Sequence, residues 1–483
     1  MKSIGDLTAP MDSTVGQTLS VLDAGGQGLC FLVDADGVLV GLVTDGDIRR
    51  GLLTGTRLDD PVARVANTEP VVDNHRRPQD EVRRRLSTRI SHIPLVDHEG
   101  RLVDYVSHFH NPRIPVLEPT LGQEELDNVV ECVTTNWISS QGKFVSEFEA
   151  AFETRHRGMR ALAVSNGTVA LHLAMAALGI GRGDEVIVPT LTFAASINAI
   201  LYTGAEPVLV DCDPRTWTID PSGVEAAITN KTRAILPVHL YGHPCDMNAI
   251  TEIAGAEGLA VIEDAAEALG SKYHGEPVGA FGDASTFSFF GNKTITTGEG
   301  GMVLFRDPAV AEHARVLRDH GMSPGRRYWH EHVGFNYRLT NLQAAVGVAQ
   351  MRRLDEFVDR KRTIASQYRE RLTPTSLTLP YESPDALHSY WLYSVLLPES
   401  MDRDGTISRL AENGVDTRPV FYPLHQMPPY RDFRRTGNLS VADSVAARGL
   451  SLPSSAGLGP EDVSQVCTAV ASAVASAELV QSS

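Results

Sequence analysis

One lysine of this chain stands in an aromatic, glycine-rich segment: Ser285-Thr286-Phe287-Ser288-Phe289-Phe290-Gly291-Asn292-Lys293-Thr294, followed by Gly298-Glu299-Gly300-Gly301. Most lysines are solvated surface residues. A lysine in such a loop can instead lie beside a cofactor and be partly desolvated, which is the condition for a nucleophilic amine. The segments around the loop must decide between these two interpretations.

Short apolar runs alternate with helical patterns on the N-terminal side of this loop. The expected strands are 161–164, 185–188, 207–210, 234–238 and 259–262, with helices such as 169–178 and 247–256 between them. Strands that alternate with helices predict βαβ units and a mostly parallel sheet, that is, an α/β fold. Ligands bind such sheets at the carboxyl ends of the strands.

Two more polar segments follow predicted strands. Ser165-Asn166-Gly167-Thr168 opens a helix, where free backbone N–H groups and the helix dipole can bind an anion. The same residue types also serve as ordinary N-caps. Asp264 comes directly after an apolar strand, so it is either a carboxylate at the sheet edge or the cap of the next helix.

An anion site, a carboxylate and a lysine at one sheet edge match the needs of pyridoxal 5′-phosphate (PLP). Its phosphate needs N–H donors, its pyridinium nitrogen needs a carboxylate, and its aldehyde needs a lysine for a Schiff base. Phe193 can cover the face of the ring by stacking. The sequence therefore predicts a PLP site with Asp264 and Lys293 as its catalytic residues.

Four segments carry a resemblance to a known family: 136–144, 238–247, 289–301 and 326–330, which read NWISSQGKF, VHLYGHPCDM, FFGNKTITTGEGG and RRYWH. They resemble the DegT/DnrJ/EryC1/StrS sugar aminotransferases, and the resemblance runs from near Ile114 to the C-terminus. It implies the type I fold of PLP-dependent transferases, which is the fold of aspartate aminotransferase. The expected parts are a PLP-binding large domain, 112–355, and a small C-terminal α/β domain, 356–483.

The resemblance also implies a role for individual residues. Lys293 binds the cofactor aldehyde and then moves a proton during transamination. Asp264 pairs with the pyridine nitrogen, and Glu267 lies beside the ring oxygen. The remaining cofactor contacts come from the phosphate-binding and ring-stacking residues Gly167, Thr168, Ser288 and Phe193, together with Asn336, which reaches the phosphate from the partner subunit of a homodimer.

The implied reaction moves the amino group of L-glutamate to C4 of a nucleotide-linked 4-keto-6-deoxyhexose. The resemblance is strongest to the subgroup that converts GDP-4-keto-6-deoxy-D-mannose to GDP-perosamine. Candidates for the sugar nucleotide combine cations, aromatic rings and hydroxyls that suit a diphosphate and a base: Trp137, Ser139, Ser140, Arg326, Arg327, Tyr328 and Trp329. The alternative for each of them is a solvated polar loop.

Two other functions remain open. PLP-dependent sugar dehydratases of the same fold have histidine in place of the lysine, so Lys293 favours transamination over dehydration. A non-catalytic nucleotide-sensing protein would have lost Asp264, Lys293 or the phosphate turn, and the sequence retains all of them.

The N-terminal part contains an internal repeat, because the segment 32–44 recurs 63 residues later as 95–107. Each copy predicts strand, turn, strand, and the two copies resemble a CBS-domain pair, 1–57 and 58–111. The resemblance implies that Thr44 and Asp47 meet the phosphate and ribose of a nucleotide. Ser107 and His110 take these places in the second copy, so one nucleotide site is expected rather than two. The alternative is a module that only oligomerises the chain, for example into tetramers.

Composition limits the remaining possibilities. The chain has 483 residues and a formal net charge of −17, a length that predicts about three structural units. The acidic balance excludes a general nucleic-acid binder, although local N–H groups can still hold a small anion. No secretory signal and no long apolar run are visible, so we expect no membrane span. Five scattered cysteines without CxxC spacing favour a reducing cytoplasm over disulfides or a metal site.

Overall fold

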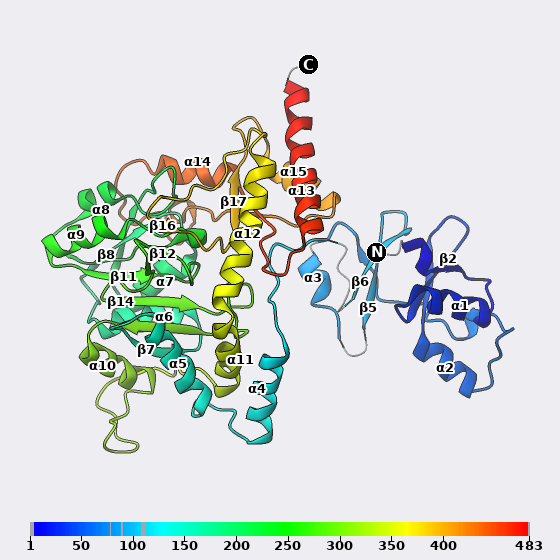
Figure 1. Ribbon diagram of the computed structural model, residues 1–483, viewed down its shortest axis with the longest axis horizontal. Helices are drawn as coiled ribbons and strands as arrows, with labels where there is room; N and C mark the ends of the chain where they lie inside the picture. Colours follow the sequence, from blue (N-terminus) through cyan, green and yellow to red (C-terminus); the bar gives the residue numbers. More distant parts are fainter. Residues whose placement is uncertain (1–3, 78, 88–89, 108–112, 482–483) are drawn as a thin grey trace. The chain divides into compact units, whose positions relative to one another are not determined.

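The computed structural model describes residues 4–77, 79–87, 90–107 and 113–481 (Figure 1). Contacts within the chain divide it into two compact units, Met1–Ile114 and Pro115–Ser483. The domain boundary predicted at residues 111 and 112 and the predicted position of His110 lie outside the described residues. The boundary predicted between residues 355 and 356 stays a prediction.

The first unit consists of two similar halves. Each half is a three-stranded sheet with flanking helix: β1 (Thr8–Pro10), α1 (Val15–Gly25), β2 (Leu29–Val33), β3 (Leu39–Thr44) and α2 (Asp45–Leu53), then β4 (Asp73–Asn74), α3 (Gln79–Arg83), β5 (His92–Val96) and β6 (Leu102–Ser107). The β5–β6 pair repeats the β2–β3 pair 63 residues later, with a register shift at the equivalent position. The strand–turn–strand repeat predicted from the sequence is confirmed.

The two halves also pair with each other through equivalent residues. The N–H of Leu39 donates to the carbonyl of Gly100 at 3.0 Å, and the N–H of Leu102 donates to the carbonyl of Gly37 at 3.1 Å. The ring of Phe31 in the first half packs at 5.3 Å from Tyr105 in the second. Each half thus buries the open face of the other, which is the usual reason for a duplicated unit.

The second unit is built on a seven-stranded sheet in the order β7-β15-β14-β11-β10-β8-β9. Its strands are β7 (Arg160–Val164), β8 (Glu185–Pro189), β9 (Glu206–Val210), β10 (Thr232–Ile235), β11 (Ala260–Asp264), β14 (Ala284–Ser288) and β15 (Gly301–Phe305). Only β15 runs against the others. The mostly parallel α/β sheet predicted from the sequence is confirmed.

Two strand ends differ from the prediction. The strand expected at 234–238 ends at Ile235, because Pro237 has no N–H to donate to a neighbouring strand. Asp264 is the last residue of β11 rather than the residue after the strand, and it pairs with Thr286 of β14. The carboxylate is therefore fixed by the sheet itself.

Helices cover both faces of this sheet (Figure 1). The helices of this part of the chain are α4 (Gln123–Thr134), which packs on α11, α5 (Lys143–Arg155), α6 (Gly167–Ala177), α7 (Ala194–Thr203), α8 (Pro221–Ala227), α9 (Met247–Glu257), α10 (Pro308–Arg318), α11 (Asn341–Arg352) and α12 (Leu354–Leu372). Alternate strand residues enter different cores: Leu162, Val164, Val303 and Phe305 pack with α6, α7 and α10, whereas Ala161, Ala163, Met302 and Leu304 pack with α5 and α11. This alternation is the period of two expected for a sheet buried on both sides.

The chain ends in a smaller group of elements. A short sheet in the order β17-β19-β18 is formed by β17 (Tyr393–Leu396), β18 (Arg418–Pro419) and β19 (Gly449–Leu452). The helices α13 (Arg403–Glu412), α14 (Ser440–Arg448) and α15 (Pro460–Gln481) accompany it, and three two-residue strands, β12 (Lys272–Tyr273), β13 (Glu276–Pro277) and β16 (Ala386–Leu387), form a separate sheet. Among the described residues, no helix is both long and apolar enough to cross a bilayer.

Candidate active site

Four parallel strands bring the predicted cofactor residues to one edge of the sheet. The carboxyl end of β7 leads into Gly167, β8 leads into Phe193, β11 ends at Asp264, and β14 ends at Ser288. Since these strands run in the same direction, their carboxyl ends meet at a common edge. The sheet therefore gathers residues that are up to about 120 positions apart in the chain.

The turn at the start of α6 is a tight cradle for an anion. Asn166 caps the helix, with its side-chain oxygen accepting the N–H of Val169 at 3.0 Å. The first N–H groups of a helix have no acceptor within the helix, so those of Gly167 and Thr168 are free to point at a ligand. A Cβ on Gly167 would lie 2.9 Å from the Cβ of Ser288, so only glycine lets the turn approach that strand so closely.

Asp264 is buried, and its carboxylate is held by two hydrogen bonds. The hydroxyl of Ser196, in the first turn of α7, donates to Oδ2 at 2.8 Å, and the N–H of Ala266 donates to Oδ1 at 3.2 Å. Burial raises the pKa of Asp264, while these bonds and the amine of Lys293 act in the opposite direction. A nearby cation stabilises the ionised form of such a buried carboxylate, and a pyridinium nitrogen is a cation of this kind.

Glu267 and Lys293 form a buried pair next to Asp264. The Lys293 Nζ lies 3.9 Å from Oε1 of Glu267. Burial lowers the pKa of Lys293 and raises the pKa of Glu267 to about 7. Both shifts favour the uncharged forms, and a neutral amine is the form that attacks a carbonyl.

A strained turn holds the other oxygen of Glu267. The N–H of Tyr241 donates to Oε2 at 2.9 Å, and Tyr241 has a φ of 53°, which is unusual for a residue other than glycine. Gly242 follows with a φ of 104°, and a Cβ there would lie 2.7 Å from Ser389 Oγ. The turn is therefore fixed by close packing against the segment 389–391.

The ring of Trp391 packs against the amine of Lys293. Lys293 Nζ lies 4.0 Å from the centre of its ring, a cation–π contact. Its Nε1–H donates to the carbonyl of Asn292 at 2.7 Å, and its ring stacks on Tyr241 at 6.2 Å. Sequence reasoning missed Ser196, Tyr241 and Trp391. Tyr241 does lie inside one of the segments that carried the family resemblance, which was the available signal for it.

Phe193 and Asn336 stand in different surroundings. Phe193 precedes α7 and is 59% exposed, which leaves the residue accessible to a ligand. Asn336 lies in the segment that passes Asp319, where its side-chain oxygen accepts from the guanidinium of Arg338 at 3.0 Å. Within the described residues, the side-chain hydrogen bonds of Asn336 go to Arg338 and not to Lys293.

These residues fit PLP. The Gly167 cradle suits a phosphate, the buried Asp264 suits a ring nitrogen, and the buried, weakly basic Lys293 suits an aldehyde. The three lie at one sheet edge beside an exposed aromatic ring. The chain therefore presents a group for the phosphate, the ring nitrogen and the aldehyde of the cofactor that the sequence predicts.

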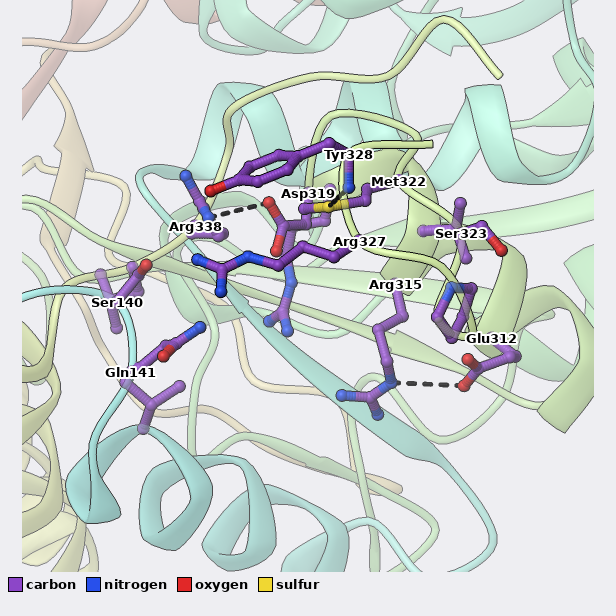
Figure 2. A pocket seen from close by; sticks show the side chains of 15 residues that line it. Ser140, Gln141, Glu312, Arg315, Asp319, Met322, Ser323, Arg327, Tyr328 and Arg338 are labelled. Atoms are coloured by element: carbon purple, nitrogen blue, oxygen red, sulfur yellow. Dashed lines mark hydrogen bonds and ion pairs between the residues drawn. The ribbon is translucent and has the colours of Figure 1, made fainter. Parts of the chain in front are cut away.

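A cavity of about 750 Å³ joins two of the segments predicted to bind a sugar nucleotide. Ser140 and Gln141 line it on one side and Arg327 and Tyr328 on the other, and Figure 2 shows the guanidinium of Arg327 extending toward Ser140 and Gln141. Its other lining residues include three arginines, Arg315, Arg318 and Arg338, which pair with Glu312, Glu149 and Asp319. Arg327 is the lining arginine without an acidic partner among the described residues, and a guanidinium of this kind suits a diphosphate.

The other predicted substrate residues are not among those that line this cavity. Arg326 stacks on Trp329 at 4.2 Å. The carbonyl of Ser139 accepts the N–H of Asn341 at 2.6 Å. Trp137 lines a second cavity of about 310 Å³.

In the first unit, Thr44 and Asp47 bond to each other. Thr44 caps α2, and its hydroxyl donates to Oδ2 of Asp47 at 2.6 Å. The other oxygen of Asp47 pairs with Arg50. Both predicted nucleotide-binding side chains thus already form a capping box.

Comparison with known proteins agrees with this geometry. The sequence pattern described as "DegT/DnrJ/EryC1/StrS aminotransferase family" matches residues 119–471. The chain belongs to this aminotransferase family. The pattern described as "CBS domain" matches residues 4–54, in the first half of the N-terminal unit. The family resemblance stated from the sequence is confirmed, and the CBS resemblance is confirmed for the first copy.

This aminotransferase matches individual relatives over almost their full length. GDP-perosamine synthase of Escherichia coli O157:H7 is 49% identical over 74% of this chain and 97% of its own. The solved structure of S. venezuelae DesV has a TM-score of 0.70 and is 37% identical over 75% of this chain and 98% of its own. The PLP form of Spr1654 from Streptococcus pneumoniae has a TM-score of 0.72 and is 26% identical over 76% and 99%. The predicted type I transferase fold is confirmed.

Proposed function

We propose that this aminotransferase uses PLP to move the amino group of L-glutamate to C4 of GDP-4-keto-6-deoxy-D-mannose, which gives GDP-perosamine. The observation that carries the proposal is the buried Lys293 amine beside Glu267 and Asp264 at the sheet edge. The relative named GDP-perosamine synthase, 49% identical, supports the choice of substrate. The five cysteines are free and buried, which suits a reaction in a reducing cytoplasm.

PLP, when bound, supplies an electron sink for the bonds broken at the amino-bearing carbon. The N–H groups of Gly167 and Thr168 and the hydroxyl of Ser288 would hold the phosphate, and Phe193 would cover the ring face. Asp264 would hold the ring nitrogen as a carboxylate. Lys293 Nζ would take up a proton and return it at the reacting carbon, and burial, which lowers its pKa, favours the neutral amine that this task needs.

The proposal includes a homodimer in which Asn336 reaches the phosphate bound by the other subunit. In its own chain, the Asn336 side chain bonds to Arg338 and not to a residue of the cofactor site. Helix α4 also presents three apolar side chains to solvent, Leu126, Val130 and Val133, which are between 49% and 58% exposed. A second copy of the chain would cover such a stripe.

The cavity between Ser140 and Arg327 is proposed to take the nucleoside diphosphate of the substrate. Its guanidinium groups suit phosphate oxygens, and the exposed ring of Tyr328 suits a base. The remaining candidates for contact with the sugar nucleotide are Trp137, Ser139, Arg326 and Trp329.

The CBS unit is proposed to bind one nucleotide at Thr44 and Asp47. The ligand would have to displace the hydrogen bond between these side chains or extend it, because both are already paired. The alternative is that the unit only assembles dimers into tetramers.

Two measurements test the main proposal. Purified enzyme with PLP should absorb at long wavelength, lose that absorbance with L-glutamate, and regain it with the GDP-linked 4-keto sugar. Lys293→Ala should abolish all three changes, whereas Lys231→Ala, at an exposed lysine, should abolish none.

The product separates the alternatives. A sugar that gains nitrogen supports transamination, and one that loses oxygen without gaining nitrogen supports a dehydratase. A protein that binds the nucleotide sugar and leaves it unchanged is a sensor. Lys293 favours the first outcome, because the dehydratases that this sequence resembles have histidine there.

A further inference from the structure

A second lysine, Lys361 of α12, is almost completely enclosed in the same unit, with 3% of its surface exposed. Its Nζ donates to the carbonyl of Ser454 at 2.6 Å and to the carbonyl of Trp391 at 3.3 Å. Within the described part of the chain, no acidic side chain lies within ion-pair distance of it. A buried lysine without a carboxylate is expensive to keep, so its presence calls for an explanation.

The two carbonyl groups suit the uncharged form of this lysine. Burial lowers the pKa of Lys361 to about 7. A neutral amine has two N–H bonds, and the structure provides two acceptors for them. Lys361 therefore acts mainly as a two-pronged donor that ties Trp391 to the segment before α15.

Trp391 is the residue through which Lys361 meets the active site. The carbonyl of Trp391 accepts from Lys361, while its ring lies 4.0 Å below Lys293 Nζ and stacks on Tyr241. The N–H of Tyr241 in turn holds Glu267. Lys361 and Lys293 also line one small cavity, together with Thr294, Gln350 and Phe357. The two lysines are thus linked by contact through a single tryptophan.

We propose that Lys361 is a positioning residue, which holds the indole of Trp391 beneath the amine of Lys293. The inference rests on the proposed function, because it gives Lys293 the catalytic task. Without Lys361, two buried carbonyls lose their donor and the tryptophan backbone is free to move. Lys293 then loses part of the ring contact that favours its charged form.

The test measures Lys293 directly in enzyme freed of PLP. Reductive methylation at a series of pH values, read by peptide mass spectrometry, gives the titration midpoint of Lys293. We expect Lys361→Met to lower this midpoint by about half a unit to one unit, the equivalent of a weakened cation–π contact. Lys231→Met, the same change at an exposed lysine, should leave it in place.

A second readout follows the holoenzyme. The glutamate half-reaction of Lys361→Met should show a kcat lowered about tenfold with an unchanged KM, because orientation and not binding is disturbed. In a Trp391→Leu background, which has no aromatic ring at this position, the same lysine change should add no further shift of the Lys293 midpoint. Additive shifts would mean that Lys361 acts by another route, which overturns the proposal.

A lysine needed only for stability gives a different result. Folded Lys361→Met with a lower melting temperature and an unchanged Lys293 midpoint overturns the proposal. If this variant does not fold, Lys361→Gln answers the same question, since its shorter amide cannot reach both carbonyls and should cause the same downward shift. The methylation readout needs neither cofactor nor substrate, so failure of the proposed reaction would be seen separately.

Discussion

Replacing Ser196 with alanine removes the hydroxyl that donates to Oδ2 of Asp264 at 2.8 Å. The residue is 1% exposed, so no water can take the place of the hydroxyl without a rearrangement of the helix start. Asp264 would keep the N–H of Ala266 on its other oxygen. The substitution therefore tests whether the ionised carboxylate at this position is what the cofactor needs.

The size of the effect follows from the charge on the acceptor. A hydrogen bond to a charged group contributes about 1.5–3 kcal/mol, so its loss raises the pKa of Asp264 by about one to two units. Burial already raises that pKa, and the hydroxyl of Ser196 opposes the rise. The affinity for PLP should fall about 10- to 100-fold. Because the ionised form is the one weakened, the defect should grow as the pH falls.

The assay is a PLP titration of cofactor-free enzyme, followed by the rate of the glutamate half-reaction at saturating PLP. Ser222→Ala is the matched control, since Ser222 also donates to an aspartate, Asp220, at 2.6 Å but is exposed at the start of α8. It should behave like the wild type. If Ser196→Ala binds PLP as tightly as the wild type at every pH, the role assigned to Asp264 is wrong.

Three further predictions concern the same region. Glu267→Gln should stabilise the cofactor-free enzyme above pH 7 by up to about 3 kcal/mol and have no effect below pH 4.5. The reason is that the pKa of the buried carboxyl is raised from 4.5 to about 7, so the wild type loses stability as the pH rises between these values. Equal changes in melting temperature at pH 4 and pH 8 would contradict this prediction. Gly167→Ala should weaken PLP binding about tenfold or more, because its Cβ would lie 2.9 Å from Ser288, and a PLP titration checks it. Arg327→Ala should raise the KM for the GDP-linked sugar about 10- to 100-fold and leave the glutamate half-reaction unchanged; steady-state kinetics with unaltered sugar KM would place the nucleotide elsewhere.

The sequence predicted those parts of the site that follow a strand. Lys293, Asp264 and the Gly167 turn each stand at a recognisable end of an apolar run, so the parallel sheet brings them together. The N-terminal duplication was equally visible, because seven of the thirteen residues in the repeated segment are the same in both copies. Both features are patterns of residue types along the chain, and such patterns can be seen in a single sequence.

The residues that tune the site were not predictable in this way. Ser196 lies 68 positions before its partner Asp264, and Trp391 lies 98 positions after Lys293. Neither follows a pattern that distinguishes it from other serines or tryptophans, and only the packing of distant segments assigns their role. Thr44 and Asp47 show the opposite case, since their spacing suggested a ligand and also makes an ordinary capping box.

The proposed reaction transfers nitrogen from glutamate to a GDP-linked 4-keto sugar. The most direct test incubates the PLP-loaded enzyme with ¹⁵N-labelled L-glutamate and equal amounts of GDP-, dTDP- and UDP-linked 4-keto-6-deoxyhexoses, and follows the products by mass spectrometry. We expect ¹⁵N in the GDP-linked sugar, located at C4, together with 2-oxoglutarate. A deoxygenated sugar without ¹⁵N, or no label in any sugar, would contradict it.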